Sequence, residues 1–212
     1  ENFWNNVNDG RIMSSPVIDD INMDGSYEVI YTTVDWSCPV GEPSCYNNLF
    51  IRNSTGGLLQ NISLGNEIYP MTTPAVADID TSAPGKEIII VAQDSISTDY
   101  DALVLCFKSN GDNCTGDWPY WPNPNLKVRL HSPVIVDING DGTNEIIVPN
   151  SEEKQLVIVN SAGGYYFNIS YKGELGSHPA LGDITNNGEL DIAIQRSGSP
   201  FIYSSFVHAN KE

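Results

Sequence analysis

Basic residues and long apolar runs are both scarce in this chain. Its 212 residues contain 10 Lys and Arg against 27 Asp and Glu, a formal net charge of -17 at pH 7. This charge repels phosphate backbones and anionic lipids, so we expect no nucleic-acid partner. No run approaches the roughly 18 consecutive apolar residues that a membrane-spanning helix needs, so we also expect no membrane insertion. Cations are the natural counterpart of such a chain.

The sequence shows neither a leader nor helical periodicity. It opens at Glu1 without the basic and apolar segments that signal peptides carry, which predicts a soluble mature form or fragment. Its apolar residues form short β-prone runs separated by turn residues, and this pattern indicates an all-β fold.

Cysteine is limited to four residues, which fall in two close pairs. Cys38 lies near Cys45, and Cys106 lies near Cys114, each pair in a polar loop or hairpin. Neither pair has the CxxC spacing of a zinc site, and no His lies near in sequence. The pairing therefore predicts two loop-stapling disulfides and an oxidising, extracellular or cell-surface location. Free thiols in a cytosolic protein are the alternative.

A short phrase recurs four times along the chain. Each copy begins with Ser, Thr or His before Pro, continues as an apolar run and ends in Asp-Ile. A polar loop containing Gly follows, and an acidic residue then opens a second apolar run. The copies occupy residues 15–21, 73–79, 132–138 and 178–184, and the second runs occupy residues 28–31, 87–90, 145–148 and 191–194. Self-similarity at a period of about 45 to 60 residues indicates repeated units that bury their apolar faces against one another.

The third copy divides into four short strands. We expect them at residues 133–138, 145–148, 155–159 and 165–171, with Gly-containing turns between them. The first copy repeats the later strands at residues 49–52 and 58–64. Four short strands per unit with no helix are typical of a β-propeller blade. The sequence therefore predicts a single domain over residues 1–212 with four blades.

The two ends of the chain have the spacing of two halves of one blade. The fourth copy stops after a strand at residues 201–207, and Asn5 precedes Pro16 by the same eleven positions that separate Asn168 from Pro179. A strand at residues 3–7 would then complete the last blade and close the ring. The predicted repeats are residues 14–71, 72–130, 131–176, and 177–212 together with 1–13. Two alternatives stay open: a fragment of a larger ring, and a strand exchanged with a neighbouring molecule.

Two of the four polar loops have the spacing of a hard-cation site. They place oxygen side chains at positions 1, 3, 5 and 9, a carbonyl at position 7 and Gly at position 6, where the backbone must turn sharply. Ca²⁺ accepts such an all-oxygen set more readily than Mg²⁺, which demands a small octahedron. The candidate ligands are Asp20, Asn22, Asp24, Ser26 and Glu28 in the first loop and Asp137, Asn139, Asp141, Thr143 and Glu145 in the third.

These copies resemble the FG-GAP repeat of integrin α chains, also called the VCBS repeat. The calcium loop of that family reads roughly Asp-x-Asp-x-Asp-Gly-x-x-Asp between the first two strands of a blade. The resemblance covers essentially the whole chain and implies a β-propeller with Ca²⁺ in its loops. This chain departs from the pattern with Asn at position 3 and Glu at position 9, which keep oxygen ligands but lengthen the last one.

The other two loops depart further from the pattern. The second, at residues 78–87, has an extra residue and no Asp or Asn at position 5, so we expect a turn without metal. The fourth keeps acids at both ends around a neutral middle, and Asp183, Asn187 and Asp191 are weaker candidates for a third calcium site. The alternative for the first and third loops is an ordinary Asx/Gly turn with solvated carboxylates. Any bound calcium is expected to be structural, because it offsets clustered carboxylates.

Asparagine sequons and one aromatic segment complete the candidate features. Asn61 and Asn168 each follow a Gly-Gly turn at the same spacing and are the favoured glycosylation sites, whereas Asn53 and Asn113 are weaker candidates. The segment 118–124 alternates aromatics with Pro; we expect it to pack between blades, and exposure as a binding surface is the alternative.

The sequence favours an interaction protein over an enzyme. The chain has three His residues, and no Ser or Cys lies in a nucleophile-elbow motif. We expect a structural, adhesive or assembly role, with partners that are further copies of the chain, another surface protein or a glycan. A carbohydrate-binding, lectin-like propeller is the alternative. A scaffold portion of a secreted polysaccharide-degrading enzyme is the third possibility, since the resemblance includes propellers that belong to lyases and phospholipases.

Overall fold

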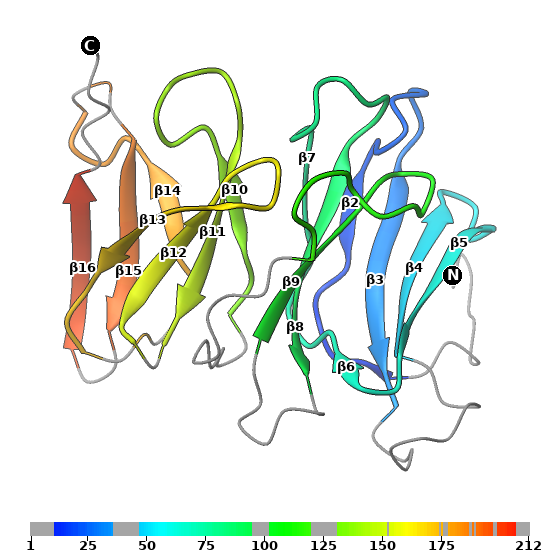
Figure 1. The fold of residues 1–212 in the computed structure, drawn as a ribbon, viewed down its shortest axis with the longest axis horizontal. Coiled ribbons are helices and arrows are strands. Elements are labelled where there is room, and N and C mark those ends of the chain that lie inside the picture. Colours follow the sequence, from blue (N-terminus) through cyan, green and yellow to red (C-terminus); the bar gives the residue numbers. More distant parts are fainter. Residues whose placement is uncertain are drawn as a thin grey trace.

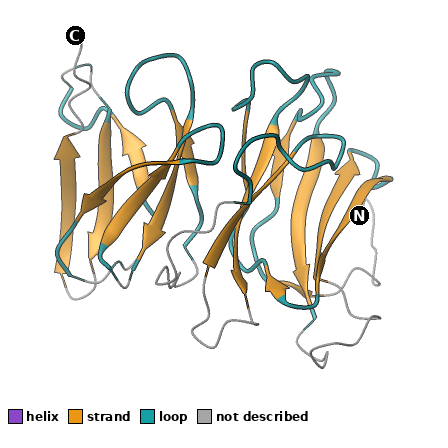
Figure 2. Ribbon diagram, in the orientation of Figure 1, coloured by secondary structure: helices purple, strands orange, loops and turns teal. Residues whose placement is uncertain are grey.

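The computed structural model describes residues 11–35, 47–94, 102–119, 131–151, 153–173, 175, 178–186, 188, 190–196 and 199–206. Within these residues the chain consists of strands and loops without a helix (Figure 2), so the predicted all-β class is confirmed. Accordingly, these residues contain no helix long and apolar enough to cross a membrane.

The described strands form four antiparallel sheets that follow one another along the chain (Figure 1). The first contains β1 (Arg11–Ile12), β2 (Val17–Asp19), β3 (Glu28–Val34), β4 (Asn47–Asn53) and β5 (Leu58–Gly65). The second contains β6 (Ile68–Tyr69), β7 (Ala75–Ala77), β8 (Glu87–Asp94) and β9 (Ala102–Phe107). The third contains β10 (Val134–Val136), β11 (Glu145–Asn150), β12 (Gln155–Val159) and β13 (Tyr165–Ser170), and the fourth β14 (Ala180–Gly182), β15 (Asp191–Arg196) and β16 (Ser199–Phe206).

The same hairpin recurs in every sheet. The acidic residue at loop position 9 opens the second strand of the hairpin and pairs with the residue just before loop position 1. The pairs are Asp19 with Glu28, Ala77 with Glu87, Val136 with Glu145, and Gly182 with Asp191. Each polar loop is therefore held at the tip of a hairpin whose register does not vary.

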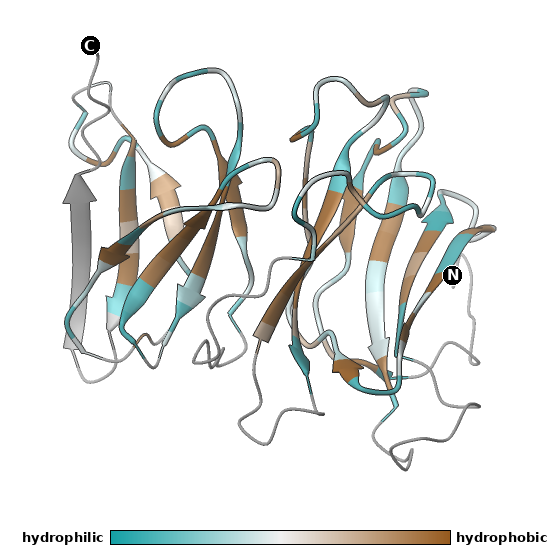
Figure 3. Ribbon diagram, in the orientation of Figure 1, coloured by the Kyte–Doolittle hydropathy of each residue, from teal (hydrophilic) through white to brown (hydrophobic). Residues whose placement is uncertain are grey.

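The inner sheets are buried on both faces. Successive side chains of a strand point to opposite faces. In β8, Ile88 packs toward the first sheet and Ile89 toward the third; in β11, Ile146 packs toward the second sheet and Ile147 toward the fourth. All four are fully buried, and each contributes about 1.5–3 kcal/mol of transfer free energy. Figure 3 shows the resulting apolar character of β8, β9, β11 and β12.

Hydrogen bonds also join consecutive repeats at the residue before the recurring proline. The Thr73 backbone N–H donates to Ser132 Oγ at 2.9 Å, and the Ser132 N–H donates in turn to His178 Nδ1 at 2.7 Å. The loops are linked as well, because the Lys86 N–H donates to the Ile21 carbonyl at 2.7 Å. Neighbouring repeats are thus held in one fixed relation by both apolar and polar contacts.

Two short strands move the repeat boundaries upstream of their predicted positions. Residues 11–12, grouped by sequence with the last repeat, form β1 and pair with β3 of the first sheet. Residues 68–69, grouped with the first repeat, form β6 and pair with β8 of the second sheet. A two-residue strand leaves no periodic pattern in a sequence, which is why neither was expected.

The described array is open. The sheet of β3–β5 lies at one end of the molecule and the sheet of β14–β16 at the opposite end (Figure 1). The described residues therefore do not form the closed four-bladed ring that the sequence predicts. The strand expected to close it, at residues 3–7, lies outside the described residues.

One disulfide joins two segments of the second repeat. Cys106 in β9 is bonded to Cys114, and their Cα atoms lie 5.4 Å apart. Cys106 is also buried in the core between the second and third sheets, so the bond ties the loop after β9 to that core. The other predicted pair, Cys38 and Cys45, lies outside the described residues.

Candidate cation-binding loops

The first loop is curled around its own carboxylates. Asp20 accepts the N–H of Asp24 at 3.0 Å and the N–H of Gly25 at 2.9 Å, one on each carboxylate oxygen. Asn22 Oδ1 accepts the same Asp24 N–H at 2.9 Å. Asp24 Oδ1 accepts the Ser26 N–H at 2.8 Å. The oxygens at positions 1, 3 and 5 are therefore turned toward the inside of one tight turn.

The third loop repeats this arrangement. Asp137 accepts N–H groups from Asp141 at 3.1 Å and Gly142 at 2.9 Å on separate oxygens. Asn139 Oδ1 accepts the Asp141 N–H at 2.8 Å, and Asp141 Oδ1 accepts the Thr143 N–H at 2.8 Å. Two loops separated by more than a hundred residues thus have the same hydrogen bonds at the same positions.

Both loops require left-handed backbone at positions 4 and 6. At position 6, Gly25 has φ of 88° and Gly142 has φ of 90°. At position 4, φ is 59° for Met23 and 74° for Gly140. Glycine adopts these angles without a steric penalty, whereas methionine adopts them only at a cost in free energy. The loop shape is therefore retained even where the residue at position 4 opposes it.

The carboxylate at position 9 accepts a hydrogen bond from the backbone N–H of position 2 of the same loop. Glu28 Oε2 accepts the N–H of Ile21 at 3.1 Å, and Glu145 Oε2 accepts the N–H of Ile138 at 3.0 Å. Both glutamates are buried, and this burial raises the pKa of each carboxyl above its usual value. The loop aspartates nearby raise the pKa of Glu28 and of Glu145 further.

The pKa of the carboxyl at position 5 is instead lowered below its usual value. The Ser26 N–H lowers the pKa of Asp24, and the Thr143 hydroxyl lowers the pKa of Asp141. Each loop therefore combines a readily ionised aspartate with a glutamate that resists ionisation. A cation that bound between them would favour the charged form of the glutamate.

Hydrogen bonds join positions 1, 3 and 5 of the first and third loops, whereas the carboxylate at position 9 is bonded to the backbone N–H of position 2. In the described part of the chain, no three His, Cys, Asp or Glu side chains are gathered closely enough to hold a metal ion. Asn22 links the set by donating to Asp24 Oδ2 at 3.1 Å, whereas Glu28 is engaged with Ile21.

The fourth loop keeps part of this geometry. Asp183 Oδ2 accepts the Gly188 N–H at 2.9 Å, as the first residue of the other two loops does with its own glycine. Asp191, fully buried, accepts the N–H groups of Ile184 and Thr185, each at 2.9 Å. The predicted ligand Asn187 lies outside the described residues.

The second loop differs from the first and third loops because two of its buried carboxylate oxygens have no hydrogen-bond partner in the described structure. Asp80 binds the Ser82 hydroxyl at 2.5 Å, and this bond lowers the pKa of Asp80. Asp78 Oδ1 and Glu87 Oε1 are buried without a hydrogen-bond partner in the described structure. Sequence reasoning classed this loop as an inert turn and missed the unpaired oxygens. Pro84, which has no N–H to give, is the feature that could have indicated them.

The favoured sequons occupy corresponding places on edge strands. Asn61 in β5 and Asn168 in β13 are both exposed on the outermost strand of their sheets. Asn113 is exposed beside the disulfide. Asn53 differs, because its Oδ1 accepts the Gly57 N–H at 2.7 Å and helps to close the turn between β4 and β5.

The aromatic segment is described only at its start. Trp118 packs against the core between the second and third sheets, as expected, and residues 120–124 lie outside the described part.

Comparisons with known proteins leave the family unassigned. No family model matches the chain, and no curated protein matches it. Two crystal structures are similar. One is a protein of unknown function from Bacteroides caccae, with a TM-score of 0.47 and 11% identity, covering 91% of this chain. The other is the V. cholerae biofilm matrix protein Bap1, with a TM-score of 0.39 and 17% identity, covering 79% of this chain. The chain spans 59% and 30% of their respective lengths.

Proposed function

We propose that this chain is an extracellular, calcium-stabilised repeat module of the β-propeller type with an assembly or adhesive role. The recurring hairpin register and the two-sided burial of the inner sheets support repeats that stack as propeller blades do. The disulfide between Cys106 and Cys114 supports an oxidising location.

The repeated loop geometry carries the calcium part of the proposal. The first and third loops arrange the oxygens at positions 1, 3 and 5 in the same way, although nothing in a plain hairpin requires that likeness. The chain also has an excess of acidic over basic residues, which favours a cationic counterpart. Calcium would draw in the position 9 glutamate and hold the hairpin tip closed.

The two ends of the array support an assembly role. Ile184 is 52% exposed, whereas Ile21, Ile79 and Ile138 at the same loop position are buried against the following sheet. At the other end, Ile18 of β2 is 66% exposed. The residues that correspond to Ile18 in the other repeats, Val76, Ile135 and Leu181, are partly buried. Apolar positions that are wholly or partly buried inside the array are thus exposed in its first and last repeats, where a second copy of the chain could cover them.

Calcium titration tests the proposal. The free energy of unfolding should rise with calcium by about 2.7 kcal/mol per site when the free ion is at 100 times its Kd. Asp20→Asn with Asp137→Asn should remove most of this increase, whereas Asp117→Asn, an exposed aspartate outside the loops, should leave it intact. An unchanged calcium increment in the double variant would refute the assignment of the loops.

A further inference from the structure

One hydrogen bond recurs between consecutive repeats, and its acceptor changes along the chain. The bond starts at the backbone N–H of the residue before the recurring proline and ends on the side chain of the equivalent residue in the next repeat. Thr73 donates to Ser132 Oγ at 2.9 Å, and Ser132 donates to His178 Nδ1 at 2.7 Å. The link between the second and third repeats therefore ends on a hydroxyl, whereas the link between the third and fourth ends on an imidazole.

The bond from Ser132 requires one protonation state of His178. A neutral imidazole has one ring nitrogen that carries a hydrogen and one that accepts a hydrogen bond. Because His178 Nδ1 accepts the Ser132 N–H, this nitrogen carries no hydrogen and the ring is neutral in this arrangement. A proton that adds to Nδ1 turns both ring nitrogens into donors. Two N–H groups then face each other, and the link is lost.

Protons from the solvent can reach this link. His178 is exposed, whereas Ser132 is half-buried. Histidine is the side chain that ordinarily changes its charge between about pH 5 and about pH 8. The Ser132 hydroxyl, which accepts from Thr73, keeps its donor and its acceptor throughout that range. Acidification therefore acts on one of these two links and spares the other.

A second histidine packs on the first. From the third repeat, the titratable side chain that faces His178 is His131, and the two rings meet edge to face with their centroids 5.5 Å apart. His131 directly precedes Ser132, and the uncharged Pro179 and Ala180 follow His178. When both rings gain a proton, two like charges lie well within one Debye length of each other. Their repulsion then adds to the loss of the hydrogen bond.

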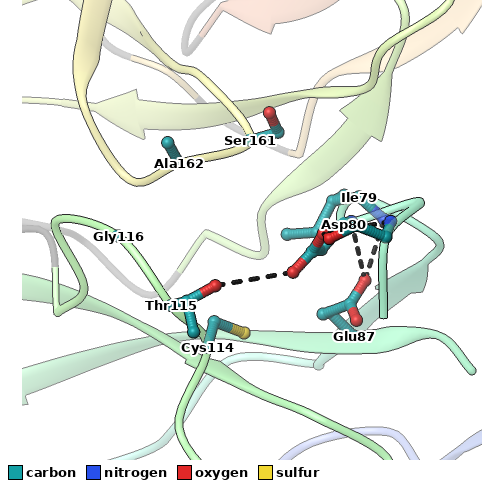
Figure 4. Close-up of a pocket in the computed structure, with 9 residues that line it drawn as sticks. Ile79, Asp80, Glu87, Cys114, Thr115, Gly116, Ser161 and Ala162 are labelled. Carbon is teal, nitrogen blue, oxygen red and sulfur yellow. Dashed lines mark hydrogen bonds between the residues drawn. The ribbon is translucent and has the colours of Figure 1, made fainter. Parts of the chain in front are cut away.

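The boundary between the second and third repeats is built from other groups. The described residues that line its crevice include Asp80, Glu87 and Thr115 but no His (Figure 4). Asp80 accepts the Thr115 hydroxyl at 3.5 Å, and Glu87 Oε2 accepts the N–H groups of Ile79 and Asp80 at 2.9 and 3.1 Å. The polar groups described at this crevice are therefore carboxylates, hydroxyls and backbone amides. The paired histidine rings distinguish the next boundary from it.

We propose that His178 is an acid-sensitive link, which loosens the fourth repeat from the third below about pH 6. The link needs a neutral ring, so its contribution is present at higher pH and is lost as pH falls through the titration range of the ring. The array then opens at one defined boundary when the medium becomes acidic. This inference does not depend on calcium, because Ser132 and His178 lie outside the four loops.

Nuclear magnetic resonance of the whole chain between about pH 8 and about pH 5 tests the link. The Ser132 amide signal should move with pH in step with the ring signals of His178, while the Thr73 amide signal stays in place. Protection of the Ser132 amide from hydrogen exchange, corrected for the intrinsic pH dependence of exchange, should fall about five- to tenfold. These local signals are needed because the buried glutamates of the loops make global unfolding respond to pH as well.

His178→Ser is the most informative variant, because it introduces at the fourth repeat the residue that the third repeat already has at this place. It should keep the fold and the bond from Ser132, and it should make the Ser132 amide insensitive to pH. His131→Gln is the matched control, since it removes the neighbouring ring and leaves the Ser132 response in place. A wild-type Ser132 amide that does not titrate, a titration that persists in His178→Ser, or an equal loss of protection at Thr73 would overturn the proposal.

Discussion

At the residue scale, three loops share a left-handed backbone angle at position 4 but carry different residues there. Position 4 is left-handed at Met23, Gly140 and Asn186, with φ of 59°, 74° and 55°. Glycine and asparagine adopt this region readily, whereas a methionine there costs about 1–2 kcal/mol. Met23 is also 54% exposed, so no buried contact compensates for the strain.

Met23→Asn should therefore stabilise the chain. We expect the free energy of unfolding to rise by about 0.5–1 kcal/mol, because asparagine tolerates the left-handed region. Chemical denaturation in the presence of chelator measures the change. Met13→Asn is the matched control, since Met13 is 50% exposed and is not among the residues with positive φ. An equal gain in the control would contradict the argument.

Ionisation of the buried glutamates opposes folding when no cation is bound. Burial raises the pKa of Glu145 above 4.5, so the folded chain holds this proton more tightly than the unfolded chain does. The free energy of unfolding therefore falls as pH rises above 4.5 through the folded pKa. Asp141 acts in the opposite sense: its pKa is lowered below 3.8, so its stabilising contribution is lost only as pH falls below that value.

Glu145→Gln should flatten this pH dependence. Its amide oxygen can still accept the Ile138 N–H, but the side chain no longer ionises. In chelator, the variant should lose less stability than the wild type between about pH 5 and about pH 8. Glu153→Gln serves as the exposed control. Parallel losses in Glu145→Gln and the wild type would rule out this role for the buried carboxyl.

At the scale of elements, the turn between β12 and β13 of the third repeat packs closely against Trp118 of the second repeat. A Cβ at Gly163 would lie 2.9 Å from Trp118 Cδ2, so the glycine lets the turn approach the indole ring. Beside it, the Asp117 N–H donates to the Ala162 carbonyl at 2.7 Å. The expectation that Trp118 packs between blades agrees with this contact.

Gly163→Ala should be more damaging than a glycine change at an open turn. Gly163 and Gly65 have similar φ, 85° and 81°, but nothing lies within 4 Å of a Cβ at Gly65. Both alanines meet the backbone penalty of about 1–2 kcal/mol. Gly163→Ala should lose about 1 kcal/mol or more beyond that, because it also displaces Trp118. Thermal or chemical unfolding measures the loss. An equal loss of unfolding free energy in Gly163→Ala and Gly65→Ala would contradict a role for the contact with Trp118.

The hairpins could be predicted from the sequence because their residues alternate between turn chemistry and apolar runs. The β10–β11 and β12–β13 pairs lie where the pattern places them, since each pair is defined by local neighbours. The orientation of the position 9 glutamates was not predictable, because it depends on a backbone N–H that only the folded loop presents. The pairing of Glu87 was missed for the same reason.

At the scale of the whole molecule, the first and last repeats of the array each expose an isoleucine side chain. The exposed Ile184 follows β14 of the fourth sheet, and the exposed Ile18 lies in β2 of the first sheet, so the two belong to the first and last sheets of the described array. A front-to-rear contact between copies joins unlike surfaces, which yields a closed ring if the rotation closes and a filament if it does not. Exposed sequons on β5 and β13 would place glycans on edge strands, where they oppose unwanted strand pairing.

The mass of the chain in solution tests the proposed assembly most directly. Light scattering after size separation should give, in calcium, particles of at least twice the 23.2 kDa chain mass, and single chains in excess chelator. Ile184→Ser should remain a single chain in calcium while it keeps the calcium-dependent rise in unfolding free energy. A wild-type chain that stays single in calcium at high concentration, or an Ile184→Ser variant that assembles as the wild type does, would contradict the account.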